Sequence, residues 1–426
     1  MRPTIGWLVF AIGAVFYSYE FLLRILPSVM TTQLMATHHI TTAGLGYLAS
    51  IYYIIYTAMQ TPVGLLIDWY GPRRLLLFAS AICTIGSFCF ASTTSLFCAA
   101  LGRFLIGFGS AFGFVGVLRL ASLWLPSHRF ALATGLVTTL GMIGGILGDV
   151  VLSHLVNTAG WHVAVMLSAW LGIATMGLIC FIPKSNPHTF STRLPHRQWR
   201  HLYRELLIIL KMPIIWLNAV VGSLLYLPLA IFGELWGVSY LQTVQQISPF
   251  DATLAISFLM WGWAIGAPLV GWFADKTGSR YRVVLGLSSA SLFFTLYILN
   301  THFSSNITLF TGLFLLGVLC SNQVLIMVIA RDNCPAHMLA TGLAVTNMII
   351  MGGGIVFQPL IGLMMRSSSA MLLADSNSPD VSIAYTQAMY IVPAAIGLAI
   401  VVLGVQLLSR KNALSAVNAR EKIGLL

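Results

Sequence analysis

Twelve long apolar segments dominate this chain, and they decide what it can fold into. A helix needs about 20 mostly apolar residues to cross a bilayer, and the sequence offers twelve such stretches. Only 8% of the 426 residues are charged, whereas a soluble domain carries about 25%. We therefore expect an all-α membrane protein with twelve transmembrane helices. The expected spans lie near residues 6–29, 44–66, 75–95, 97–122, 130–152, 162–182, 213–240, 251–273, 281–299, 306–329, 339–364 and 387–408.

The positions of the basic residues predict the orientation of these helices. Eighteen of the 22 Lys and Arg fall on one side when Arg2, the even-numbered connections and the C-terminal tail are placed together. By the positive-inside rule that side is the cytoplasm, so both termini are expected there, in a bacterial inner membrane. The net charge of +11 then reflects topology. We expect no nucleic-acid partner.

The two halves of the chain repeat one another. The stretch GLLIDWYGPRR (64–74) is matched 207 residues later by GWFADKTGSRYR (271–282), with glycine, aspartate, glycine and arginine at equivalent places. LATGL occurs at 132–136 and, with the same shift, at 339–343. A parallel duplication predicts two pseudo-symmetric six-helix bundles with a binding site at their interface. The expected parts are a first bundle (1–182), a cytoplasmic linker (183–211), a second bundle (212–408) and a cytoplasmic tail (409–426).

These repeats carry a resemblance to a known family. The G-x-x-x-D-x-x-G-x-[RK] loop, present in both halves, resembles the signature of the major facilitator superfamily, and GRFLIGFGSAFGF (102–114) is similar to its second motif. The stretch FYSYEFLLRILPSVM (16–30) is similar to the start of the proteobacterial intraphagosomal amino acid transporters. The resemblance implies the major facilitator fold and a secondary transporter, not an enzyme. The fifth span lacks the Gly-Pro pair typical of the superfamily's proton-driven exporters, which disfavours export.

One acid and one base lie in the first span, at Glu20 and Arg24. An ionised residue at the bilayer centre costs at least about 2.5–3.5 kcal/mol, so such residues pair or face a cavity. The four-residue spacing favours a salt bridge on one helix face. Because Arg binds a carboxylate bidentately and Glu attracts an ammonium, the pair predicts an amino-acid site. The alternative is a self-neutralising pair that only lowers the cost of insertion.

Other polar residues in the expected spans are candidate ligands or proton carriers. Each Asn, Gln or Tyr alone more often forms an interhelical hydrogen bond than binds a substrate. Glu234 has no basic residue on its own helix, so it is the first candidate for proton coupling, followed by Glu20 and Asp149. The candidate ligands beside the Glu20–Arg24 pair are Tyr17, Tyr226, Glu234, Asn322, Gln323, Asn347 and Gln358.

The duplicated loops predict a cytoplasmic gate. Asp68 and Asp275 end the second and eighth spans, and each precedes a glycine and basic residues. A carboxylate there can cap a neighbouring helix N-terminus or pair with an arginine at the same depth. The alternative is that these residues only fix the loops. The arginines expected in the gate are Arg73, Arg119, Arg280 and Arg331.

These features together favour uptake of a small polar solute, preferably an amino acid, by proton symport through a monomer in the lipid bilayer. Alternatives are proton-antiport export of drugs or metabolites, or uptake of a nucleoside or dipeptide. A passive channel would not explain the duplicated loops. An integral-membrane enzyme would need clustered catalytic residues, and the sequence has neither HExxH nor GxSxG. The six cysteines show no CxxC spacing, so we expect no metal site and no cofactor.

Overall fold

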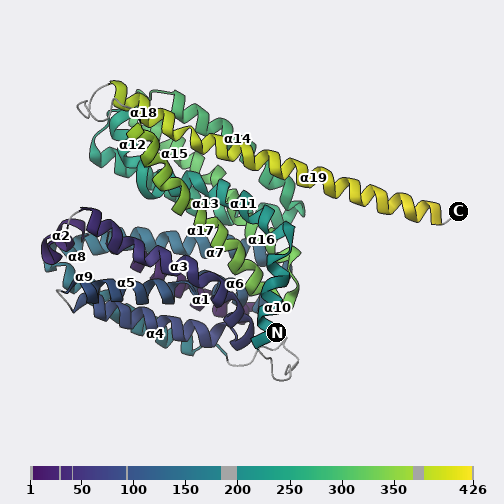
Figure 1. Cartoon of the computed structure of the whole chain (residues 1–426), viewed down its shortest axis with the longest axis horizontal. Helices are drawn as coiled ribbons and strands as arrows, with labels where there is room; N and C mark the ends of the chain where they lie inside the picture. Colours follow the sequence, from purple (N-terminus) through teal and green to yellow (C-terminus); the bar gives the residue numbers. More distant parts are fainter. Residues whose placement is uncertain are drawn as a thin grey trace. The chain divides into compact units, whose positions relative to one another are not determined.

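The computed structural model describes residues 3–27, 30–40, 42–92, 95–183, 199–367 and 379–424, and all regular structure in these ranges is helical (Figure 1). Twelve segments in them are long and apolar enough to cross a membrane, which confirms the fold class and the number of spans predicted from the sequence. The helices that form most of these segments are α1 (Pro3–Ile25), α3 (Thr42–Tyr70), α4 (Pro72–Ala91), α5 (Leu96–Ser110), α6 (Gly113–Trp124), α7 (Phe130–Leu147), α9 (Trp161–Cys180), α11 (Pro213–Leu227), α13 (Pro249–Thr277), α14 (Arg280–Asn300), α15 (Asn306–Cys320), α16 (Leu325–Asn333), α17 (Leu339–Ser367) and α19 (Ile391–Gly424). The other α-helices in the described ranges are α2 (Thr31–His38), α8 (Ser153–Ala159), α10 (Trp199–Leu210), α12 (Gly237–Val244) and α18 (Pro379–Met389).

Four of the expected spans are not continuous α-helices. The fourth breaks between α5 and α6, where glycines weaken the helix, and a 3₁₀ segment (Ser321–Val324) separates α15 from α16 in the tenth. π-Helical segments follow α7 (Gly148–Leu152) and α11 (Pro228–Trp236). Helices of this type are rare and often mark functional sites. The four spans were predicted from the sequence, but their interruptions were not.

Contacts divide the chain into two compact units. The first unit comprises Met1–Ile215 with Ala330–Met348, and the second Trp216–Ile329 with Ile349–Leu426. Helix α17 therefore contributes its first turns to the first unit and the remainder to the second. In the first unit α1 packs on α6 and α7, and α4 packs on α5 and α9; in the second, α13 packs on α15 and α14 on α19. The predicted boundary at 183–211 stays a prediction, since 184–198 lie outside the described ranges.

The duplicated loops each place a glycine at positive φ. Gly71 lies between α3 and α4 with φ +81° and ψ 151°, and Gly278 follows α13 in the left-handed conformation with φ +64° and ψ 2°. Glycine takes positive φ without the steric penalty that other residues meet, so each glycine can end its helix. Pro72 then begins α4, where its missing N–H is not needed. The two turns end α3 and α13 at equivalent points of the repeat, and this places Asp68 and Asp275 in the last turns of those helices.

Candidate functional site

The charged pair of the first span lies on α1, and the structure buries both residues. Glu20 is fully buried and Arg24 is 8% exposed. Arg24 Nη2 lies 3.5 Å from Glu20 Oε1, an ion pair across one helical turn. In a buried pair each charge depends on the other, because a buried charge that loses its partner is strongly destabilising. This pair is the centre of the polar site in the first unit.

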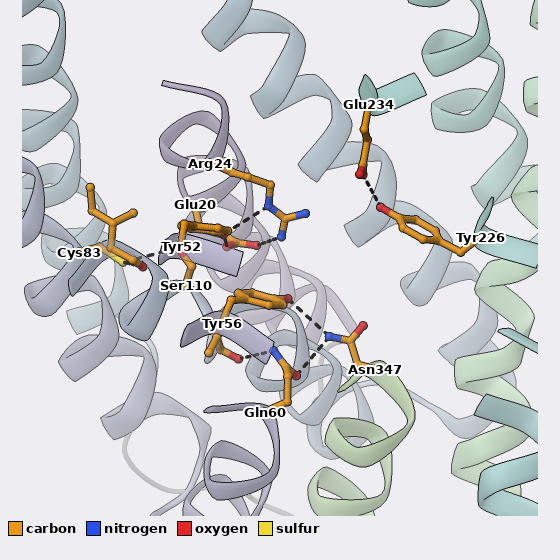
Figure 2. Close-up of polar contacts among 12 residues, drawn as sticks. Glu20, Arg24, Tyr52, Tyr56, Gln60, Cys83, Ser110, Tyr226, Glu234 and Asn347 are labelled. Atoms are coloured by element: carbon orange, nitrogen blue, oxygen red, sulfur yellow. Dashed lines mark hydrogen bonds and ion pairs between the residues drawn. The ribbon is translucent and has the colours of Figure 1, made fainter. Parts of the chain in front are cut away.

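Tyr52 of α3 completes the ion pair (Figure 2). Its hydroxyl donates to Glu20 Oε2 at 3.0 Å and accepts from Arg24 Nε at 3.2 Å. The tyrosine is itself fully buried. One hydroxyl therefore bridges the carboxylate and the guanidinium, and it ties α1 to α3 at the level of the pair.

Aromatic rings surround the Arg24 guanidinium. Its Cζ lies 4.2 Å from the ring centroid of Phe21, 5.2 Å from that of Tyr56 and 5.6 Å from that of Tyr52. Cation–π contacts of this kind are worth about 0.5–2 kcal/mol each. They restrict the directions in which the planar group can point, so a carboxylate that reaches Arg24 meets a fork that is already oriented.

Arg103 of α5 supports the site from behind. The side chain is fully buried, and its Nη1 and Nη2 atoms donate to the carbonyls of Leu23 at 2.9 Å and Arg24 at 3.4 Å. These carbonyls belong to the last turn of α1, where helical donors are missing. The Arg103 Cζ also lies 4.9 Å from the Tyr52 ring centroid. Arg103 therefore holds the end of α1 and the bridging tyrosine in place.

Access differs between the two charges of the pair. The side chain of Glu20 is 0% exposed, whereas that of Arg24 is 7% exposed. Helix α6 covers the carboxylate closely, since a Cβ added at Gly113 would lie 3.3 Å from Glu20 Cγ. The sequence-based expectation that Glu20 attracts a substrate ammonium therefore lacks a contact surface in this structure. Glu20 serves Arg24 as a counterion.

Tyr17, the other candidate ligand on α1, lies in a packed wall. Its ring centroid is 5.0 Å from that of Phe21 and 5.3 Å from that of Phe114. A Cβ added at Gly141 of α7 would lie 2.6 Å from Tyr17 Cε1. This close packing shapes the site around Phe21 and, through it, the position of the Arg24 guanidinium.

A second polar cluster lies in the second unit, around the π-helical segment Pro228–Trp236. The Tyr226 hydroxyl donates to Glu234 Oε1 at 2.6 Å. Gln358 Nε2 of α17 donates to the Ala230 carbonyl at 3.0 Å and to Glu234 Oε2 at 3.5 Å. The structure thus brings together three of the candidate residues. The Glu234 side chain is exposed and lies at the end of the candidate span Pro213–Glu234.

Asn322 of the tenth span forms one interhelical and one local hydrogen bond. It accepts from Ser288 Oγ at 3.2 Å and donates to the Leu319 carbonyl at 2.7 Å. Gln323 is buried next to it in the 3₁₀ segment. Asn322 therefore links α14 to this segment, which is the commoner role of such side chains.

Asn347 belongs instead to the first unit, where it contacts α3. Its Nδ2 donates to Gln60 Oε1 at 3.1 Å and to the Tyr56 hydroxyl at 3.4 Å. Sequence reasoning missed Tyr52, Tyr56 and Gln60. The available signal was their spacing, because they lie at every fourth position and the series ends at Asp68, which the loop motif had already identified.

Asp68 joins three elements of the first unit. It pairs with Arg119 of α6 at 3.3 Å. It also accepts from the backbone N–H of Ala340 at 3.3 Å and of Thr341 at 2.9 Å, and from Thr341 Oγ1 at 3.1 Å. The carboxylate thus caps the N-terminus of α17 and neutralises an arginine at once. Arg119, in addition, donates to the Ala336 carbonyl at 3.0 Å. We call Asp68, Arg119 and Thr341 the Asp68 cluster.

The equivalent residues of the repeat are arranged differently. Asp275 lies 3.9 Å from Arg280 Nη2, across its own loop. Arg73 of the first loop donates to the Ile182 carbonyl at 2.6 Å, beyond the end of α9. In the first copy Asp68 pairs with α6, whereas in the second copy Asp275 pairs with an arginine of its own loop.

Arg331, in the last turn of α16, contacts the turn before α7. Arg331 donates to the Ser127 carbonyl at 3.2 Å, and its Cζ lies 4.3 Å from the Phe130 ring centroid. The side chain of Asp149 lies outside the part that the structure describes. Within the described residues, no three His, Cys, Asp or Glu side chains are grouped so as to hold a metal ion.

Comparison with known proteins places the chain in a family. The model of the Major Facilitator Superfamily matches residues 8–358. The chain is 25% identical over 275 residues to the membrane sensor protein UhpC of Salmonella typhimurium, which covers 61% of this chain and 62% of the relative. It is 24% identical to the probable sulfoacetate transporter SauU of Cupriavidus necator, over 43% of each protein. It is 23% identical to the sialic acid transporter NanX of Escherichia coli, over 61% of this chain and 62% of the relative.

These matches span less than two thirds of each relative, whereas the family model covers most of the chain. The expected likeness to the intraphagosomal amino acid transporters is not confirmed by them. The twelve candidate spans, the duplicated loops and the family match agree, and this chain is a multi-pass membrane protein that belongs to the Major Facilitator Superfamily.

Proposed function

We propose that this chain is a secondary transporter that imports a small organic acid together with protons, and that amino acids are among the acids to be tested. The observation that carries the proposal is the Arg24 guanidinium, which is nearly buried, bridged to Glu20 by Tyr52 and surrounded by aromatic rings. An arginine fork matches a carboxylate in geometry as well as in charge. A strongly hydrated lysine ammonium would not.

The names of two relatives support an acid as the substrate. Sulfoacetate and sialic acid both carry a carboxylate. In this proposal Arg24 binds the shared carboxylate, and other residues select the remainder of the molecule. An amino acid satisfies Arg24 equally well, provided that residues other than the concealed Glu20 hold its ammonium.

Glu20 supplies a reason to couple the acid to a proton. If Arg24 turns to a substrate carboxylate, Glu20 is left as a buried carboxylate without its cation, which is strongly unfavourable. A proton taken up by Glu20 removes that penalty, so one proton accompanies one carboxylate. Glu234 is the second candidate carrier, because it is exposed and hydrogen-bonded to Tyr226. Asp149 is the third.

A transporter of this kind draws its energy from an ion gradient. The sequence contains no G-x-x-x-x-G-K-[ST] loop, which an ATP-driven pump would need to cradle phosphates. The superfamily match and the names of the relatives give no support to an enzyme. The direction that we propose is import from the outside into the cytoplasm, by proton symport. Both termini are proposed to be cytoplasmic.

A second candidate function follows from one comparison. The chain resembles a membrane sensor protein over 61% of its length. A sensor would bind the same acid at Arg24 but would not accumulate it, and would instead pass the binding signal to a partner. Binding without uptake is the outcome that would favour this function.

The test is uptake by proteoliposomes containing the purified chain. Labelled sulfoacetate, N-acetylneuraminate and a set of amino acids would be compared with the uncharged sugar glucose, each with and without an inward proton gradient. We expect at least one acid, and not glucose, to accumulate only with the gradient. Gradient-driven efflux of the acids would instead favour export.

Substitution of Arg24 then tests the site itself. Arg24→Lys keeps the charge but loses the planar fork, so uptake should fall at least tenfold. Arg129→Lys is the matched control, because Arg129 is exposed in the turn before α7 and should transport normally. Unchanged uptake by Arg24→Lys would refute direct carboxylate recognition.

A further inference from the structure

Five residues of α3 form a series of contacts that winds slowly around the helix. Tyr52, Tyr56, Gln60, Gly64 and Asp68 follow one another at four-residue spacing, which we call the α3 ridge. The first four are buried, and the side chain of Asp68 is 1% exposed. With a rise of 1.5 Å per residue, the ridge is about 24 Å long. It joins the Arg24 site at one end to the Asp68 cluster at the other.

Tyr52 and Tyr56, at the N-terminal end of the ridge, both contact Arg24. Tyr52 bonds to the guanidinium, and the Tyr52 and Tyr56 rings are stacked with centroids 5.8 Å apart and planes at 17°. The Tyr56 ring also lies under the Arg24 Cζ at 5.2 Å. The cation therefore fixes the orientation of Tyr56, whose hydroxyl accepts the hydrogen bond from Asn347 of α17.

The middle of the ridge is a polar contact between α3 and α17 (Figure 2). Asn347 donates to Gln60, and Gln60 Nε2 donates at 3.3 Å to the Ala111 carbonyl, beside the break between α5 and α6. Tyr56, Gln60 and Asn347 are all buried. A buried amide that loses its partner carries a desolvation penalty, so these bonds form and break together. We call these three residues the Asn347 catch.

The lower end of the ridge is the Asp68 cluster. Between the two polar contacts, Gly64 lies directly against α17, where an added Cβ would be 2.8 Å from Thr341 Cα and 2.6 Å from Ala344 Cβ. The first turns of α17 are therefore held to α3 at three successive levels. One level bonds to a residue that touches Arg24.

We propose that the Asn347 catch transmits the state of Arg24 to the contact between α3 and α17. The proposal rests on the proposed function, in which Arg24 takes a substrate carboxylate. When the guanidinium turns to that carboxylate it leaves the Tyr56 ring, Tyr56 loses its orientation, and the bond from Asn347 weakens. The start of α17 is then held only by the close packing at Gly64 and by the Asp68 cluster. In this proposal Asn347 acts as a positioning residue and not as a direct ligand.

The chain contains its own reporter of this contact. Cys334 precedes α17, and its Sγ lies where a Cβ on Gly342 would be. Burial, with the Asp68 carboxylate nearby, raises the pKa of the Cys334 thiol to about 12. Cys334 is half-buried. Since only the thiolate reacts with maleimides, Cys334 should react slowly while α17 is held and faster when α17 separates from α3.

The experiment measures the alkylation rate of Cys334 with N-ethylmaleimide in a full-length protein in which the other five cysteines are replaced. No substrate is added. Asn347→Ala and Tyr56→Phe each remove a net hydrogen bond, so the rate should rise between about 2-fold and 12-fold. The double variant Glu20→Gln/Arg24→Gln, which neutralises the site, should raise the Cys334 alkylation rate by a similar factor. Adding Asn347→Ala to this double variant should not raise the rate further, because both changes act on the same contact.

The matched control is Thr346→Val, because the buried Thr346 hydroxyl bonds only to the Gly342 carbonyl of its own helix at 2.8 Å. Its rate should equal that of the parent. The proposal is wrong if Thr346→Val is as reactive as Asn347→Ala, if Asn347→Ala is unreactive, or if the neutralised site leaves Cys334 unchanged. Tyr56→Phe removes only the hydroxyl that accepts from Asn347 and keeps the packed ring. It therefore tests the proposal even if Asn347→Ala does not fold. Because no substrate is present, a failure of acid uptake would refute the proposed function and leave these rates unaffected.

Discussion

Replacing Gly64 by alanine should separate α3 from α17 without touching any charge. The added Cβ would lie 2.6 Å from Ala344 Cβ, 2.8 Å from Thr341 Cα and 2.9 Å from the Ala340 carbonyl oxygen. Ordinary contact begins at about 3.4 Å, so the closest approach falls short by about 0.8 Å. Two of the three neighbours are backbone atoms, which cannot rotate away as a side chain can. Relief requires the two helices to move apart.

The magnitude follows from two opposing terms. Alanine in a helix interior is favoured over glycine by about 1 kcal/mol, but that gain is the same whether α17 is held or released. It therefore cancels in the equilibrium between the two. Overpacking costs about 1–3 kcal/mol and acts only on the held state. The released fraction should rise about 5-fold to 150-fold.

Alkylation of Cys334 in the protein with no other cysteine measures this fraction directly. Gly177→Ala is the matched control, because it lies within α9 and an added Cβ there meets nothing within 4 Å. Both variants gain helix propensity, but only Gly64→Ala should react faster. If its rate stays within twofold of the Gly177→Ala rate, the close contact between α3 and α17 does not govern the opening, and the reasoning fails.

Three further outcomes are expected. Asp68→Asn removes the ion pair with Arg119, weakens the cap on α17 and also removes a charge that raises the Cys334 pKa, so Cys334 should react at least as fast as in Asn347→Ala; a parental rate would contradict a gating role for Asp68. The raised Cys334 pKa of about 12 leaves about one thiol in 10,000 ionised at pH 8, so alkylation of the parent should be roughly a thousandfold slower than that of an ordinary thiol. Its rate should climb tenfold per pH unit, and a plateau near pH 9 would show the thiol to be unburied. Glu234→Gln, if Glu234 carries the coupled proton, should still exchange labelled acid across the membrane but not concentrate it with a pH gradient; accumulation equal to that of the parent would move the proton to Glu20 or Asp149.

Much of the fold could be predicted because hydropathy and duplication are local properties of the sequence. The twelve spans follow from segment length, and the positive-φ turns at Gly71 and Gly278 follow from the repeated loop. Arg119 was among the candidate partners of Asp68, since both were expected near the same end of their helices. The breaks and π-helical segments could not be predicted, because tertiary packing selects them over a plain α-helix.

The site was predictable only in part, because the sequence of one helix does not show which residues of other helices it contacts. Glu20 and Arg24 could be found from their charge, but the burial of Glu20 depends on α6, which contributes a glycine at that level. Tyr52 could not be chosen among the tyrosines of α3 without knowing that it faces α1. Asn347 was identified as a polar residue in a span, but its partners Tyr56 and Gln60 lie almost 300 residues away in the sequence.

The four-residue spacing of the α3 ridge also limits which insertions and deletions the helix can accept. An α-helix turns 100° per residue, so each step of four residues advances the ridge by about 40°, and Asp68 points about 160° away from Tyr52 around the helix axis. This phase difference lets one helix present Tyr52 to α1 and Asp68 to α17. Inserting or deleting a single residue between positions 53 and 67 would rotate one end by about 100° against the other. Substitutions at positions between the ridge residues can therefore be tolerated where a change of length by one residue cannot.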